Sequence, residues 1–301
     1  MDRTESTAGS RGPSFPPAML VGIYGLFDFL APAIAGPLAE GNRVGEELAI
    51  AFATAIVGCA LAQFGALAVW GVMGTGRPIA RWAGSLATAA VLLGCLFAGA
   101  KIGTKGGLSW REFGEFLQVV PLAYLSVQIP LWTMSVGWGW RLVAAGAVAP
   151  PPQRFTLRGL FFATAVVAAT LALLQLGQPA ESRGEAIAVI AFCLIGGPIW
   201  SIVTVLPCLL SAFLPSTPHR GVKFLLAYGA ALSLALVGAA LAMGGPNSAA
   251  PDFGFVAIYG TFCGAVAFTL FGSFLVLRND GYRLRRVKIE AAVNQAVDIL
   301  G

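Results

Sequence analysis

Long apolar runs that contain no internal lysine or arginine are the feature that most constrains how this 301-residue chain can fold. A helix needs about 20 apolar residues to cross the hydrocarbon core of a bilayer. Only Arg81 intrudes, in the first turn of the third run, where its side chain can extend toward the headgroups. Eight runs reach the required length, and they cover residues 17–38, 48–73, 79–100, 116–136, 157–176, 186–214, 222–243 and 253–277.

The composition indicates the same class of protein. Charged residues make up 11% of the chain and the mean hydropathy is +0.79, whereas soluble domains carry about 25% charged residues. A water-soluble globule of this size could not cover its surface with so little charge. Because helices satisfy their backbone hydrogen bonds internally in lipid, we predict an all-α, polytopic integral membrane protein with about eight transmembrane helices.

The distribution of basic residues predicts the orientation. With eight spans both chain ends lie on one side, which carries 14 Lys and Arg residues against 5 on the other. The positive-inside rule then places both ends in the cytoplasm. If Pro121 and Pro130 instead break 116–136 into a re-entrant hairpin, the N-terminus moves outside and the C-terminus stays cytoplasmic. The length of this run favours a true span.

Proline and charge divide the chain into five predicted regions. Residues 1–16 lack a short apolar core with a cleavage site, so we interpret them as a disordered cytoplasmic tail and not as a signal peptide. The proline-rich linker 146–156 cannot continue a helix. It separates a first four-helix membrane half, 17–145, from a second, 157–277. The Pro-x-Trp shared by "IPLW" and "GPIW" has no matching flanks, so no repeat is established.

The last region, 278–301, is basic and then amphipathic. We expect its basic residues to contact anionic lipid headgroups, each contributing about 1 kcal/mol, and the residues after them to form a short helix on the cytoplasmic membrane face. The net charge of +5 is explained by topology and lipid, without nucleic acid. The expected headgroup contacts are Arg283, Arg285, Arg286 and Lys288.

Tryptophan gathers where the fourth run ends. Trp132, Trp138, Trp140 and Arg141 close that run, and Trp is typical of the headgroup layer because its ring is apolar and its N–H is polar. We interpret this stretch as an interface belt. An aromatic platform for a ligand is the alternative.

A short segment resembles a known group of proteins. "QRFTLRGLFFATAVVAATLALLQLG", preceded by "VVPLAYLSVQIPLW" and "GWRL", resembles the F-[ST]-[LI]-R-x-L membrane entry of uncharacterised multi-span membrane proteins of planctomycete-type bacteria. The resemblance covers about residues 118–177. It implies a bacterial inner (cytoplasmic) membrane protein, and it carries no catalytic residue.

A few polar residues lie within the apolar runs. Asp28 lies near the midpoint of the first run, where a lone charged carboxylate costs about 2.5–3.5 kcal/mol. We therefore expect it to be protonated or to face a polar interior. It is either a proton or cation site on a transport path or a structural hydrogen bond between helices, and we favour the latter. Gln63, Gln118 and Gln128 either join helices or line a cavity with Asp28.

Prolines and glycines predict helix breaks. Pro121 and Pro130 lie in the fourth run, and the long sixth run contains Gly196, Gly197, Pro198 and Pro207. Discontinuous helices bind ions in some transporters, although a kinked, tilted helix is the commoner outcome. Gly260 and Gly264 have GxxxG spacing, which we interpret as intramolecular packing or as the contact of a homo-oligomer.

The sequence does not fit the residue patterns of the enzyme active sites that we considered. The single histidine, His219, lies on a short loop, so the two-histidine zinc motif of metalloproteases is absent from the sequence. The five cysteines form no C-x-x-C and read as buried free thiols, so neither a metal site nor a cofactor is implied. We expect a non-enzymatic membrane protein with a structural or interaction role. The alternative is a small-molecule or ion transporter that uses Asp28.

Overall fold

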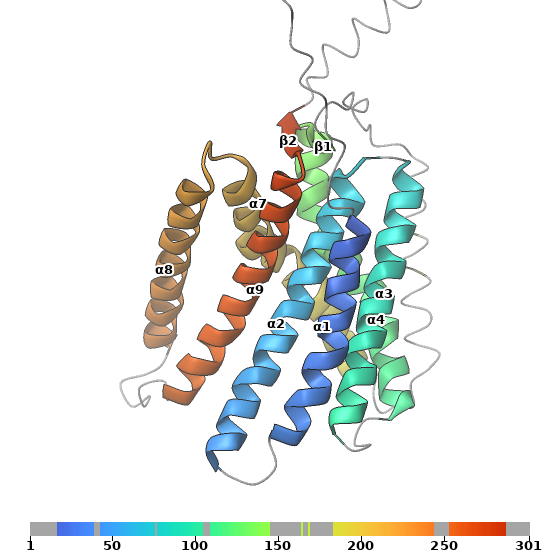
Figure 1. Cartoon of the computed structure of the whole chain (residues 1–301), viewed down its shortest axis with the longest axis vertical. Helices are drawn as coiled ribbons and strands as arrows, with labels where there is room; N and C mark the ends of the chain where they lie inside the picture. Colours follow the sequence, from blue (N-terminus) through green and yellow to red (C-terminus); the bar gives the residue numbers. More distant parts are fainter. Residues whose placement is uncertain are drawn as a thin grey trace, which may run out of the picture.

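The computed structural model is a bundle of long helices that run side by side (Figure 1). It describes residues 17–38, 43–75, 77–104, 109–144, 183–243 and 253–286, and the two helical positions Thr164 and Ala168. The helices are α1 (Pro17–Leu38), α2 (Arg43–Met73), α3 (Pro78–Gly103), α4 (Trp110–Trp132), α6 (Arg183–Trp200), α7 (Leu206–Phe213), α8 (Pro218–Met243) and α9 (Phe253–Asn279). Two π-helical segments, η1 (Thr133–Gly137) and η3 (Ser201–Val205), and two strands, β1 (Trp140–Ala144) and β2 (Tyr282–Arg286), complete it.

Five stretches of the described helices are long and apolar enough to cross a membrane, which fits a multi-pass membrane protein. The predicted number of eight spans is not confirmed by this, and most of the fifth predicted run lies outside the described residues. The five stretches are Ala18–Ala35, Ala49–Met73, Pro78–Gly103, Cys193–Phe213 and Gly260–Asn279.

Helix α2 lies at the centre of the described bundle, where it packs against α1, α3, α4 and α9. Because α9 packs along α2 and α6 packs along α4, the two predicted membrane halves contact each other at two places. Glycine permits the α2–α9 approach, since a Cβ atom on Gly58 would lie 2.9 Å from the Phe262 carbonyl oxygen.

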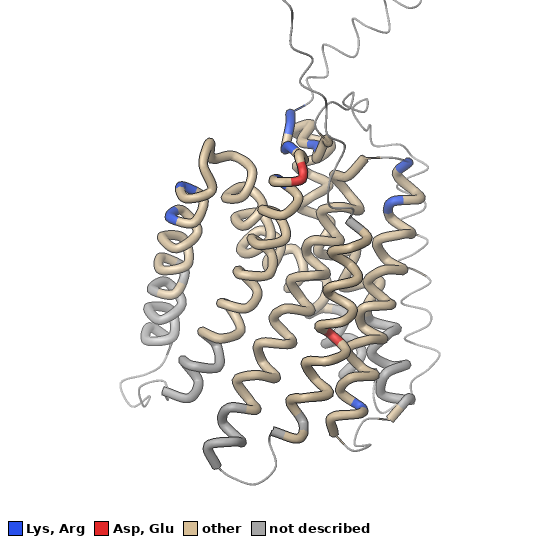
Figure 2. Tube along the Cα trace, viewed as in Figure 1, with Lys and Arg blue, Asp and Glu red and all other residues tan. Residues whose placement is uncertain are grey.

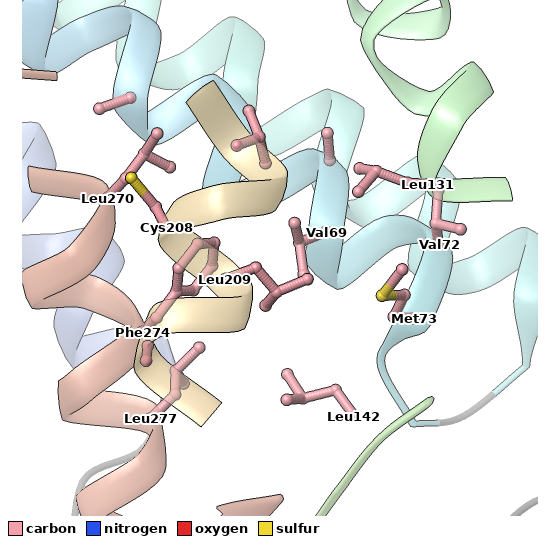
Figure 3. Close-up of a cluster of buried hydrophobic side chains, with 14 of the residues drawn as sticks. Val69, Val72, Met73, Leu131, Leu142, Cys208, Leu209, Leu270, Phe274 and Leu277 are labelled. Carbon is pink, nitrogen blue, oxygen red and sulfur yellow. The ribbon is translucent and has the colours of Figure 1, made fainter. Parts of the chain in front are cut away.

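The hydrophobic core lies toward the end of the bundle that carries the strands (Figure 3). Its side chains come from α2, α4, β1, α7 and α9, including Met73, Leu131, Leu142, Leu209 and Phe274. Elements distant in the sequence therefore meet at this end, and they bury side chains in protein where a lone helix would expose them to lipid.

The fold is mostly helical, as the predicted all-α class requires, and it also contains a short two-stranded antiparallel ribbon. Strand β1 pairs with β2, from Trp140 opposite Arg286 to Ala144 opposite Tyr282. Gly139 and Gly281, which directly precede the two strands, have φ angles of 70° and 94°, a conformation that glycine adopts at little cost. Each strand follows a helix, and its partner lies far away in the sequence, so no local pattern revealed it.

The prolines and glycines named as helix breaks lie within or between consecutive helical segments. Helix α4 runs through Pro121 and Pro130 and continues into η1. Helix α6 likewise runs through Gly196, Gly197 and Pro198 and continues into η3, and Pro207 opens α7.

Both π-helical segments begin directly after the tripeptide Pro-x-Trp, at residues 130–132 and 198–200. A proline lacks the N–H that would close the preceding turn, and the wider turns follow within three residues. The result is a bulge in each helix, which keeps the helix continuous.

Candidate functional site

Asp28 and Gln63 form a buried contact between α1 and α2. The Gln63 Nε2 donates a hydrogen bond to Asp28 Oδ1 over 2.9 Å. Each side chain is 1% exposed, and Asp28 is the twelfth of the 22 residues of α1. The sequence singled out both residues, and the structure brings them together.

Two further polar contacts surround this pair and tie α9 to its neighbours. The hydroxyls of Tyr24 and Ser273 are hydrogen-bonded, and Thr269 Oγ1 donates to Cys59 Sγ over 3.2 Å. The spacing is regular, because Tyr24 precedes Asp28 by four residues, Cys59 precedes Gln63 by four, and Thr269 precedes Ser273 by four. Side chains four apart lie on one helix face. Each of the three helices therefore contributes one polar pair to a small cluster, which we call the α1–α2–α9 cluster.

The chemistry of the pair favours a neutral Asp28. Within the described part of the chain, Gln63 Oε1 has no hydrogen-bond partner. A protonated carboxyl has one O–H donor, and this donor would satisfy that oxygen while Gln63 Nε2 bonds the other carboxyl oxygen. An acid–amide pair of this kind leaves no net charge in the hydrocarbon, which avoids the cost of a buried carboxylate.

Gln128 does not join this cluster. Its Oε1 accepts a hydrogen bond from Trp82 Nε1 over 3.1 Å, and its Nε2 lies beside Gly71. Since Gly71 is eight residues beyond Gln63, the two glutamines lie about 12 Å apart along the axis of α2. Gln63 and Gln128 therefore belong to separate hydrogen-bonded contacts. The side chain of Gln118 lies outside the described residues.

Two buried arginines form a second polar centre, which the sequence analysis missed. Arg141, expected in the headgroup belt, is 1% exposed, and Arg81, expected to extend outward, is 9% exposed. Arg141 Nη1 donates to the Val72 carbonyl over 3.0 Å, and Arg81 Nη2 approaches the same oxygen at 3.4 Å. Arg81 Nη1 also bonds the Gly74 carbonyl. Both guanidinium groups thus meet at the C-terminal end of α2.

The other predicted contact residues lie on the surface. Arg283, Arg285 and Arg286 are exposed on β2, and Lys288 lies outside the described residues. Trp138 is 55% exposed, as a belt residue requires. Gly260 and Gly264 are exposed on α9, and a Cβ atom on either would have no neighbour within 4 Å. Among the described residues, none packs closely against these two glycines.

Within the searched part of the chain, no three His, Cys, Asp or Glu side chains lie together in a way that could hold a metal ion. His219 is exposed at the start of α8. The five cysteines are free thiols.

Comparison with known proteins adds no relative. The chain matches no protein-family model, and no curated protein or solved structure matches it. The polar geometry of the two buried centres is therefore the basis for assigning a function.

Proposed function

We propose that this protein is a non-enzymatic, multi-pass protein of a bacterial inner membrane with a structural or interaction role. The single observation that carries the proposal is the Asp28–Gln63 contact. A carboxyl that is 1% exposed and bonded to a glutamine of the next helix joins two helices.

The proposal includes eight spans with both chain ends in the cytoplasm. The support is the charge distribution over the described residues (Figure 2). Among the basic residues whose side chains are described, Lys101 lies at the end opposite the ribbon, whereas the ribbon end carries Arg77, Arg81, Arg141, Arg220, Lys223, Arg278, Arg283, Arg285 and Arg286. By the positive-inside rule, the ribbon end is the cytoplasmic one. Exposed Arg283, Arg285 and Arg286 then face anionic headgroups.

A double-mutant cycle tests the structural role. Asp28→Ala, Gln63→Ala and the double variant are purified, and their free energies of unfolding are compared in one detergent. A structural contact predicts a favourable coupling energy of about 0.6 kcal/mol, and up to about 1.7 kcal/mol. Additive effects of the two substitutions would show that the contact does not hold α1 to α2.

A small-molecule or ion transporter is the second candidate. One observation favours it: the unpartnered Gln63 Oε1 lies beside a carboxyl near the middle of the bundle. A proton that leaves Asp28 would free one side of this pair for another ligand. Transport requires water to reach position 28 from at least one side of the membrane, whereas a structural contact requires it to stay dry.

A further inference from the structure

Among the residues whose side chains the structure describes, the ribbon end is strongly basic. The C-terminus of a helix carries about half a negative charge, and at α2 this partial charge meets two full positive charges, those of Arg81 and Arg141. Two acidic residues have described side chains: Asp28, which is bonded to Gln63, and Asp280 at the end of α9. Burial and the charge of Arg81 lower the pKa of Arg141 to about 10.

The unsatisfied atoms of the two arginines are all donors. Within the described part of the chain, Arg81 Nε and Arg141 Nη2 are buried without a hydrogen-bond partner. Capping of α2 does not account for them, because the Val72 and Gly74 carbonyls are already bonded by other nitrogens of the same groups. An anionic acceptor would satisfy these donors and compensate the two positive charges at once.

The ribbon adds a third positive charge to the same place. Arg141 lies directly opposite Arg285 in the antiparallel ladder, so the two side chains leave the same face of the ribbon. Like charges directly opposite each other destabilise a strand pair. An anion bound between them removes this repulsion, so the strand register itself indicates a bound partner.

We propose that Arg81 and Arg141 bind a phosphate group, with Arg285 at the outer rim of the site. A guanidinium group presents a planar fork of donors that matches the oxygens of a phosphate. The phosphate group belongs to a lipid headgroup or to free phosphate. This site differs from the exposed Arg283 and Arg286, since its two ligating side chains are buried and fixed by the end of α2.

The test uses the full chain, purified in detergent without lipid. The unfolding temperature is measured against the concentration of three probes: dioctanoyl phosphatidylglycerol, dioctanoylglycerol, which has the same tails without phosphate, and sodium phosphate against sodium chloride at equal ionic strength. Arg81→Gln is the test variant, and Arg141→Lys, which keeps the charge but loses the fork, is the second. Arg220→Gln is the matched control, because Arg220 is exposed at the same end on α8.

We expect phosphatidylglycerol to raise the unfolding temperature and dioctanoylglycerol to leave it unchanged. Arg81→Gln and Arg141→Lys should each weaken the apparent affinity by about tenfold or more, as loss of a charge-assisted hydrogen bond predicts, and Arg220→Gln should not. A response to sodium phosphate as well identifies free phosphate as a sufficient ligand, whereas a response to phosphatidylglycerol alone identifies the lipid. The proposal is overturned if neither phosphate probe stabilises the wild-type protein, or if Arg220→Gln weakens the affinity as much as Arg81→Gln.

Discussion

The two buried polar centres differ in whether their charges and hydrogen-bonding groups find partners among the described residues. At the Asp28–Gln63 pair, Gln63 Nε2 donates to Asp28 Oδ1, and a protonated Asp28 would supply the donor that Gln63 Oε1 lacks. At the Arg81–Arg141 pair, two positive charges share one carbonyl oxygen, and donor groups stay unsatisfied in the described part of the molecule. Burial alone therefore does not mark a ligand site. A buried polar group whose hydrogen-bond partner lies on a neighbouring helix joins the two helices. A buried group whose positive charge is not compensated needs a ligand.

Removing one buried arginine should have the largest effect, and its size should depend on the membrane. In anionic lipid we expect Arg141→Met to lower the free energy of unfolding by about 3–5 kcal/mol, the usual effect of deleting one member of a buried ion pair. In uncharged detergent the effect should be near zero or stabilising, because the substitution removes repulsion from Arg81. Unfolding curves measured in both conditions check this. An equal loss in both would mean that Arg141 is needed only for packing and for capping α2.

Gln63→Leu should destabilise the protein by about 1–3 kcal/mol, because it leaves a buried carboxyl without its partner. In contrast to Arg141→Met, the effect should be the same in anionic lipid and in uncharged detergent. The measurement is the same pair of unfolding curves. A dependence on lipid charge would show that Asp28 is ionised and would break the distinction between the two centres.

Gly58→Ala should cost about 1–3 kcal/mol, the range for overpacking, because its Cβ atom would lie 2.9 Å from the Phe262 backbone oxygen. It would force α9 away from α2 close to the α1–α2–α9 cluster. Gly260→Ala on the exposed face of α9 is the matched control and should leave stability unchanged. Denaturation of the two variants side by side provides the check. If Gly260→Ala is the more harmful, the exposed glycine face of α9 contacts another chain.

Asp28→Asn should have the smallest effect, below about 1 kcal/mol. Asparagine nearly matches the shape of a protonated aspartate, and its amide can donate to Gln63 Oε1 while its oxygen accepts from Nε2. The unfolding temperature of this variant, compared with that of Asp28→Ala, measures the value of the hydrogen bonds at constant charge. A large loss in Asp28→Asn would indicate that the native residue carries a charge.

The sequence identified some of these residues for a sound physical reason. A lone carboxyl or amide in an apolar run is costly unless it has a partner, so Asp28 and Gln63 were recognisable one at a time. Their pairing depends on how α1 and α2 are rotated about their axes, which no local pattern encodes. Tyr24, Cys59, Thr269 and Ser273 were missed because such residues are ordinary in membrane helices. Their common four-residue spacing was the one available signal.

The arginine centre could not be read from the sequence for a different reason. An arginine near a run end and beside tryptophans is normally exposed to headgroups, and Arg141 follows that pattern. It is buried because β1 folds back along the end of α2 and pairs with β2, a contact between segments far apart in the chain. The proline positions were informative, yet they mark bulged helices, since neighbouring helices support the backbone through a π turn.

The central claim, that Asp28 is a dry structural contact, is tested most directly by water access at position 28. The five native cysteines are replaced, a single cysteine is placed at position 28, and intact and inverted membrane vesicles are treated with a membrane-impermeant thiol reagent. Cysteines placed at Thr104 and Thr217, both exposed at opposite ends of the described bundle, confirm that each face is reachable. We predict that position 28 stays unlabelled from both sides and reacts only after unfolding. Labelling of the folded protein from either side would contradict this account and make transport the leading function.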